Sequence, residues 1–124
     1  VGYITLHIHS AMGEKVDEGM LAAVIVNESI QQIEQECGLS IDVNSLSYSR
    51  LLTHMKYLMA RLRENETLTL DMEEYTKNAF PYSYQVAAHI IERLSRTLNR
   101  EVPQIETGYL AMHIERVCQN ERQA

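Results

Sequence analysis

This 124-residue chain contains five histidines, whose imidazoles can exchange protons and act as nucleophiles near neutral pH. Two of them occur in similar surroundings, because residues 2–11 read GYITLHIHSA and residues 108–117 read GYLAMHIERV. The shared histidines are His7 and His113, which lie 113 − 7 = 106 residues apart. An offset of this size is that of a domain rather than of a short repeat. We therefore expect a repeated domain with a histidine at an equivalent place in each copy.

A further histidine, His54, lies between two arginines in a run that reads RLLTHMKYLMARL. On a helix, Arg50 precedes His54 by one turn and Arg61 follows it by two, so the three side chains share a face. Guanidinium groups gain nothing from a neutral or cationic imidazole, but they donate charge-assisted hydrogen bonds to a phosphorylated one. The pattern is therefore compatible with a phosphoryl-accepting histidine that has Arg50 and Arg61 beside it. The alternative is that both arginines pair with acids on neighbouring helices, and the spacing alone favours that alternative.

The remaining aromatic and imidazole side chains have a plainer interpretation. His7 and His113 each border an apolar stripe, a position where a histidine is more often structural than reactive. His9 and His89 are expected to be structural or solvated. Tyr109, one turn before His113, is expected in the core. Residues alone thus leave the reactive role of any histidine open.

The elements that would position these side chains are helices. Apolar residues recur at helical spacing throughout, and no strictly alternating segment bounded by hairpin turns occurs. Gly38 is suited to end one helix, and Pro81 and Pro103 are suited to open two others. The sequence predicts an all-α, five-helix bundle with helices over residues 20–37, 45–64, 68–80 and 81–99, and a fifth after Pro103 that frays beyond Cys118.

The polar segment GEKVDEG at residues 13–19 separates the first motif from the next periodic run. We place a domain boundary there. Residues 1–15 are then the end of a preceding domain with its linker, and residues 16–124 are one further domain with a short C-terminal tail.

Composition excludes several classes of function. The chain has 11 Lys and Arg against 17 Asp and Glu, a net charge of −6, which opposes direct binding to nucleic acid. No apolar run is long enough for a membrane span, and Cys37 and Cys118 form no CxxC motif, so we expect a cytoplasmic domain with two core thiols. No phosphate-binding loop, kinase motif or spaced metal-ligand set occurs. We expect no cofactor, no metal and no autonomous enzyme, so any phosphoryl group must come from another protein.

Three segments together resemble a known family. Residues 45–56 read SLSYSRLLTHMK, residues 80–81 read FP, and residues 106–117 read ETGYLAMHIERV. They resemble the phosphotransferase-system regulation domain of BglG-type transcriptional antiterminators, over about residues 16–120. Ile105 beside Glu106 departs from the acidic residues that tend to precede the final helix in this family.

The resemblance implies a specific role. The domain would be an all-helical bundle that dimerises, and here it would be the second regulation domain of its protein. His54 and His113 would accept phosphoryl groups from phosphorylated HPr or from phosphotransferase components of a sugar transporter, and His7 would be a phosphorylation site of the preceding domain. RNA would be bound by a separate domain at the N-terminal side.

Three other functions stay open from the sequence. The same domain occurs in DNA-binding transcriptional activators, and the residues upstream of Val1 would distinguish these from antiterminators. A histidine phosphorelay enzyme would pass the phosphoryl group onward. A metal site formed by His7, His54 and His113 is the third possibility, although no ligand spacing supports it.

Overall fold

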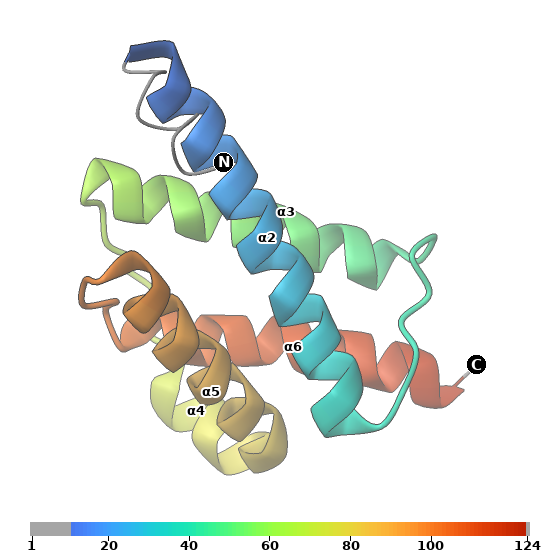
Figure 1. The fold of residues 1–124 in the computed structure, drawn as a ribbon. Coiled ribbons are helices and arrows are strands. Elements are labelled where there is room, and N and C mark those ends of the chain that lie inside the picture. Colours follow the sequence, from blue (N-terminus) through green and yellow to red (C-terminus); the bar gives the residue numbers. More distant parts are fainter. Residues whose placement is uncertain (1–10, 124) are drawn as a thin grey trace.

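A computed structural model of the protein describes the backbone of residues 11–123 and the side chains of residues 19–122. This part of the chain contains five helices and no strand (Figure 1), which confirms the predicted all-α, five-helix bundle. The helices are α2 (Ala11–Cys37), α3 (Leu46–Glu64), α4 (Glu73–Ala79), α5 (Pro81–Leu98) and α6 (Ile105–Gln123).

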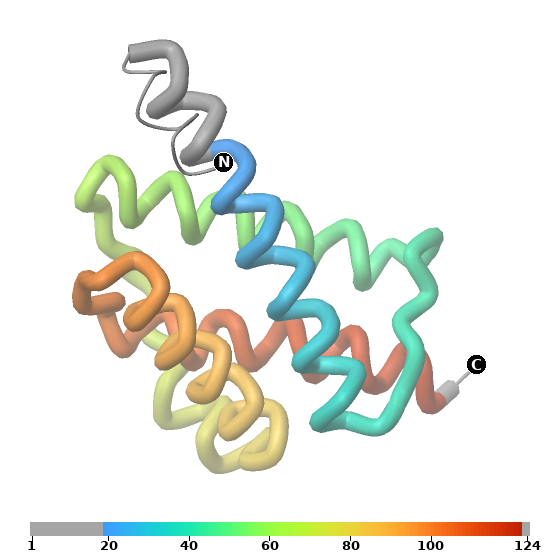
Figure 2. Tube along the Cα trace, in the orientation of Figure 1, coloured from blue at the N-terminus to red at the C-terminus, as the bar shows by residue number. Residues whose placement is uncertain are grey.

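Helix α6 is the element around which the bundle is built. It contacts α3, α4 and α5, whereas α2 crosses the bundle and contacts α3 and α5 (Figures 1 and 2). The short α4 and the longer α5 form a pair on one side of α6. The two predicted phosphate acceptors lie on α3 and α6, so the contact between these two helices decides whether their side chains meet.

Local signals in the sequence fix most helix ends. Ser45 caps α3, and its hydroxyl accepts a hydrogen bond from the backbone N–H of Tyr48 at 3.1 Å. Pro81 occupies the first turn of α5, where its missing N–H costs nothing. Residues in the left-handed conformation follow three helices, namely Gly38 (φ 65°), Asn65 (φ 58°) and Asn99 (φ 52°).

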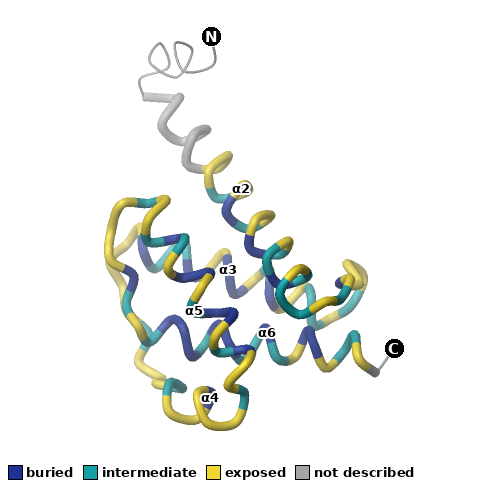
Figure 3. The backbone as a smooth tube through the Cα atoms, turned by 60° about the horizontal axis from the view of Figure 1, so that its bottom comes forward, coloured by how far each residue is buried: buried dark blue, intermediate teal, exposed yellow. Residues whose placement is uncertain are grey.

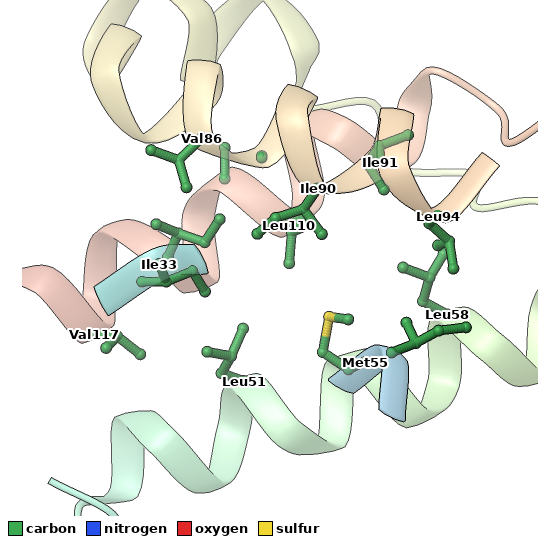
Figure 4. Close-up of a cluster of buried hydrophobic side chains, with 14 of the residues drawn as sticks. Ile33, Leu51, Met55, Leu58, Val86, Ile90, Ile91, Leu94, Leu110 and Val117 are labelled. Carbon is green, nitrogen blue, oxygen red and sulfur yellow. The ribbon is translucent and has the colours of Figure 1, made fainter. Parts of the chain in front are cut away.

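The apolar stripes of α3, α5 and α6 meet in one core, with Ile33 of α2 closing it (Figure 4). The burial pattern follows the helical period, with buried positions on inner faces and exposed positions outside (Figure 3). The stripe predicted on α6 is confirmed, because Leu110, Ile114, Val117 and Cys118 are fully buried. The core also contains Leu51, Met55, Leu58, Val86, Ile90 and Leu94.

The first helix differs from its prediction. It begins at Ala11 rather than Met20, and it runs through residues 13–19, the polar segment at which a domain boundary was predicted. A glycine inside a helix costs only about 1 kcal/mol, and the residues between the two glycines are compatible with a helix. The domain boundary at residue 15 stays a prediction. Residues 1–10, with His7, His9 and the first copy of the motif, lie outside the described residues.

Two other helices differ in length. Helix α4 covers Glu73–Ala79 instead of residues 68–80, because the Asp71 carboxylate accepts a hydrogen bond from the Glu73 N–H and starts the helix there. Helix α6 continues to Gln123 rather than fraying after Cys118. Its last turns are held by Glu121, which accepts a hydrogen bond from the Asp42 N–H at 2.7 Å.

Within the described residues, none of the helices combines the length and the apolar character that crossing a membrane requires.

Candidate functional site

The structure brings the two predicted acceptor histidines into direct contact. His54 projects from α3 and His113 from α6, and their rings stack with centroids 4.6 Å apart and planes inclined by 20°. Tyr109, one turn before His113, adds a third ring. Its centroid lies 4.9 Å from that of His54 and 5.6 Å from that of His113. Tyr109 is partly buried and is therefore a wall of this site rather than a core residue as predicted.

These three rings line an open groove of about 440 Å³ between α3 and α6. His54 lies at its base and is only 4% exposed, whereas His113 is partly buried. Two large side chains stand exposed at the rim, Leu46 (64%) and Tyr57 (62%). The other lining residues are Ser49, Arg50, Thr53, Arg61 and Leu68.

Both imidazoles are neutral at neutral pH. Burial lowers the pKa of His54 to about 3, and it is lowered further by His113 when that ring is protonated and by the positive charge of Arg61. Burial also lowers the pKa of His113 to about 4, and the nearby charges of Arg116 and Arg50 act in the same direction. A neutral imidazole carries one ring nitrogen with a free lone pair, which is the form that acts as a nucleophile.

Within the described part of the chain, one nitrogen of each imidazole ring lacks a hydrogen-bond partner. Nε2 of His54 and Nδ1 of His113 are both buried and have no hydrogen-bond partner among the described residues. Buried imidazole nitrogens in a purely structural role are normally hydrogen-bonded. Two unpaired nitrogens in one groove are therefore an argument for a function of this pair beyond packing.

The two arginines predicted beside the phosphate have different environments. Arg61 forms a two-pronged ion pair with Glu106, in which Nε lies 2.8 Å from Oε2 and Nη2 lies 2.7 Å from Oε1. The Glu106 side chain is 1% exposed and that of Arg61 is 15% exposed. The alternative considered for Arg61, a pair with an acid on a neighbouring helix, therefore holds. Arg50 is exposed on the groove wall, and no carboxylate of residues 19–122 lies within salt-bridge distance of it.

A second acidic residue, Glu73 of α4, fixes the start of α6. Its carboxylate accepts hydrogen bonds from the Gly108 N–H at 2.9 Å and from the Tyr84 hydroxyl at 2.7 Å. The backbones approach so closely that a Cβ atom on Gly108 would lie 2.8 Å from the Glu73 nitrogen. Gly108 is therefore required for the contact that positions Tyr109 and His113 over the groove.

The one other histidine within the described residues, His89, does not join the site. His89 is exposed on α5, and its Nδ1 lies 2.9 Å from Oε1 of Glu36, as expected for a solvated side chain. Within the described residues, no group of three or more His, Cys, Asp or Glu side chains gathers as a metal site would need. His54 and His113 are the pair that the fold brings together.

Two residues of the site were not given a role from the sequence. Glu106 was noted only as an acid at the start of the last motif, and its partner became visible once α3 and α6 were placed side by side. Tyr109 was assigned to the core because it neighbours an apolar stripe, although its spacing of four residues from His113 put both on one face. The roles of Glu106 and Tyr109 depend on contacts of α6 with α3, which neighbouring residues in the sequence do not specify.

Comparison with known proteins gives a consistent result. The profile of the PRD domain matches residues 27–117, which include all of α3, α4 and α5 and both histidines. The GlcA/glcB genes antiterminator of Staphylococcus carnosus is 33% identical over 122 residues, which cover 96% of this chain and 42% of that protein. The PtsGHI operon antiterminator of Bacillus subtilis is 29% identical over 121 residues, covering 94% of this chain and 43% of that protein. The chain thus spans less than half the length of these relatives.

Proposed function

Since the chain belongs to the PRD domain family, we propose that it is the regulatory domain of a transcriptional antiterminator in which His54 and His113 accept phosphoryl groups. The observation that carries this proposal is the stacked pair of neutral imidazoles in an open groove. A phosphate acceptor needs an unprotonated ring nitrogen and access for a donor. Burial in the groove keeps a ring nitrogen unprotonated, and the opening of the groove between α3 and α6 gives access to a donor.

The transfer itself is simple. A ring nitrogen of His113 or His54 attacks the phosphorus of a phosphorylated donor protein, so that a new N–P bond forms while the donor's bond to phosphorus breaks. The donors we propose are phosphorylated HPr and phosphotransferase components of a sugar transporter. In this scheme the domain is a phosphoryl acceptor and not an enzyme, because the only group that it contributes to the reaction is a neutral imidazole.

Arg50 is the arginine best placed to pair with a phosphoryl group on His54 or His113. Its side chain is exposed on the groove wall, and its charge already acts on His113. Arg61 donates one N–H from Nε and one from Nη2 to Glu106, so two N–H groups on Nη1 and one on Nη2 are left for a phosphoryl oxygen. A phosphoryl group carries about two negative charges near neutral pH, so it would change the balance of forces along the α3–α6 contact.

The relatives support the choice between possible whole proteins. Both are described as antiterminators, which favours RNA binding by a domain outside this chain over the DNA-binding activator. We propose that the regulatory domain forms a homodimer in the cytoplasm, with the histidine groove in or beside the interface, and that the domain itself does not bind nucleic acid. Phosphorylation would then act by shifting how the two copies pack.

The experiment is phosphorylation of the purified chain with a mixture of phosphoenolpyruvate, enzyme I and HPr, with and without a sugar-specific transporter component. Acid-labile phosphate should appear, and peptide mapping under alkaline conditions should place it on His54 and His113. His54→Ala and His113→Ala should each lose their own label. His89→Ala is the matched control, because this exposed histidine lies outside the groove and its loss should leave labelling unchanged. Label confined to His89 or His9 would contradict the proposal.

A further inference from the structure

A pair of thiols joins two helices at a distance from the histidine groove. Cys37 is the last residue of α2 and Cys118 lies within α6, and their Sγ atoms are 3.3 Å apart. Cys118 is fully buried, whereas Cys37 is only partly buried and packs against the core. The chain contains two cysteines in all, so each thiol has the other as its one possible partner within the molecule.

The backbone beside Cys37 allows the two sulfur atoms to come closer. A disulfide has a sulfur–sulfur bond of about 2.0 Å, so the observed separation must shorten by about 1.3 Å. Cys37 is followed by Gly38, which ends the helix in the left-handed conformation with no atom within 4 Å of the position a Cβ would take. The open space beside Gly38 leaves room for the end of α2 to move by this amount toward Cys118.

We propose that Cys37 and Cys118 are a redox modification site that forms a reversible disulfide between α2 and α6 on exposure to a peroxide or a small-molecule disulfide. The pairing does not depend on the phosphorylation proposed above. It uses the contact between two helices that are far apart in sequence, so the bond would close a loop of about 80 residues and would restrict the unfolded chain strongly.

The two thiols have unequal roles in the reaction. Burial raises the pKa of the Cys118 thiol to about 12, and its hydrogen bond to Cys37 adds to the effect, so the more accessible Cys37 reacts first. The Cys37 sulfur attacks a peroxide oxygen, the O–O bond breaks, and a sulfenic acid and one water result. Cys118 then attacks the Cys37 sulfur, an S–S bond forms, the S–O bond breaks and a second water leaves. The two thiols lose two electrons, and hydrogen peroxide is reduced to two waters.

The disulfide would fix the end of α2 to the helix that carries His113, five residues before Cys118. Since phosphorylation is proposed to act on the contacts of α6, the oxidised and reduced forms would present the same histidines on bundles of different rigidity. This consequence follows from the position of the bond and requires no further site.

The test uses the reduced, desalted wild-type chain, treated with hydrogen peroxide or with oxidised glutathione. The intact mass under non-reducing conditions should fall by about 2 Da, both thiols should resist iodoacetamide after denaturation, and dithiothreitol should restore them. The midpoint of thermal unfolding should rise by about 10 °C on oxidation. Cys37→Ser and Cys118→Ala are matched variants that should show neither the mass loss nor the rise.

Three results would overturn the proposal. The first is that disulfides form only between chains, seen as covalent dimers without the monomer mass loss. The second is that Cys37 progresses to a sulfinic acid while Cys118 stays available to iodoacetamide after denaturation. The third is that both thiols persist under conditions that oxidise a free small-molecule thiol completely. Since the wild-type chain itself gives each result, none of them depends on whether a variant folds.

Discussion

At the scale of single residues, the site is two imidazoles kept uncharged by their surroundings. His54 is almost completely removed from water and His113 partly so, and positive groups lie on both sides of the pair. The groove is thus built against protonation of the rings. The proposed phosphoryl group would bring negative charge to the pair, whereas a proton would bring positive charge, so the two would act on the site in opposite ways.

The first prediction concerns pH. Both histidines have a folded-state pKa below the ordinary value of 6.5, at about 3 and about 4. The unfolded chain therefore binds protons first as the pH falls. Their contribution to stability is fully present above pH 6.5 and is lost as the pH falls from 6.5 to about 4 for His113 and to about 3 for His54. Urea unfolding at pH 7, 6 and 5 should show a loss of up to about 1.4 kcal/mol per pH unit for each histidine.

Variants separate this effect from the titration of carboxylates. His54→Gln and His113→Gln should each flatten the slope between pH 7 and 5, a range in which ordinary carboxylates stay ionised. His89→Gln, at an exposed position outside the groove, should not flatten the slope. A slope that is the same in all three variants and in the wild type would show that the buried pair does not titrate in this way.

The second prediction concerns the two acceptors together. Their rings are 4.6 Å apart, so two phosphoryl groups would lie within about 8 Å and would repel by about 1–2 kcal/mol even in water. The doubly phosphorylated chain should therefore be about tenfold rarer than the product of the two single occupancies. Intact mass spectrometry at alkaline pH over a titration of donor measures both quantities. Independent filling of the two sites would contradict a shared groove.

The third prediction concerns the buried ion pair. Glu106→Gln leaves the Arg61 charge without its partner, and the free energy of unfolding should fall by about 3–5 kcal/mol. Arg96→Met breaks the exposed pair with Glu92, whose side chains are 69% and 68% exposed, and should change stability by less than about 1 kcal/mol. Chemical denaturation of both variants tests the contrast. Equal effects of the two substitutions would mean that burial does not set the strength of the Arg61–Glu106 pair.

At the scale of the elements, the approach of α4 to α6 decides where the histidine of the last motif lies. Glu73 receives the N–H of Gly108, and the backbones meet there without space for a side chain. A side chain at position 108 would therefore both weaken the packing of α4 against α6 and shift the position of His113. Gly108, the first residue of the repeated motif, is therefore needed for packing and takes no part in a reaction.

The fourth prediction follows from that contact. Gly108→Ala would place a Cβ 2.8 Å from the Glu73 nitrogen, so α4 must move, and the chain should lose about 1–3 kcal/mol of stability. Gly19→Ala is the matched control, since nothing lies within 4 Å of the added atom and α2 is helical there. It should be neutral or stabilising by up to about 1 kcal/mol. Thermal unfolding compares the two, and an equal shift would argue against the close approach.

The helices themselves could largely be predicted, because Ser45, Pro81 and Gly38 act through local geometry. The start of α4 could not, because it depends on Asp71 in a segment whose apolar pattern is mixed. The site was partly predictable in the same sense. His54 and His113 were identified from their motifs, but their stacking depends on how α3 and α6 cross, which no local pattern specifies.

At the scale of the whole molecule, the groove is one open face of a bundle that carries a net charge of −6. Exposed Leu46 and Tyr57 stand at its rim, where an approaching protein would meet them first. The net negative charge of the chain opposes binding to a nucleic-acid backbone, whereas the groove itself is lined by Arg50 and Arg61 and by no carboxylate of the described residues.

The fifth prediction tests control of the whole assembly. The chain alone should not shift RNA or DNA at physiological salt, and sedimentation should show a dimer whose dissociation constant changes when His54 and His113 are replaced by aspartate. Alanine at the same positions supplies no charge and is the control for loss of the rings. A monomer at high micromolar concentration in all three forms, or RNA binding by the isolated chain, would contradict the regulatory role.

Helix α6 has a consequence for how such sequences diverge. From Ile105 to Cys118 only Arg116 is exposed, so nearly every position in this stretch is held by packing, by Glu73 or by the groove. A gene copy that lost His113 would still need Gly108 and the buried apolar residues of α6 for packing. The residues that flank His113 are therefore constrained by the fold. Whether a related protein shares the proposed phosphoryl acceptance has to be judged from His54 and His113 themselves.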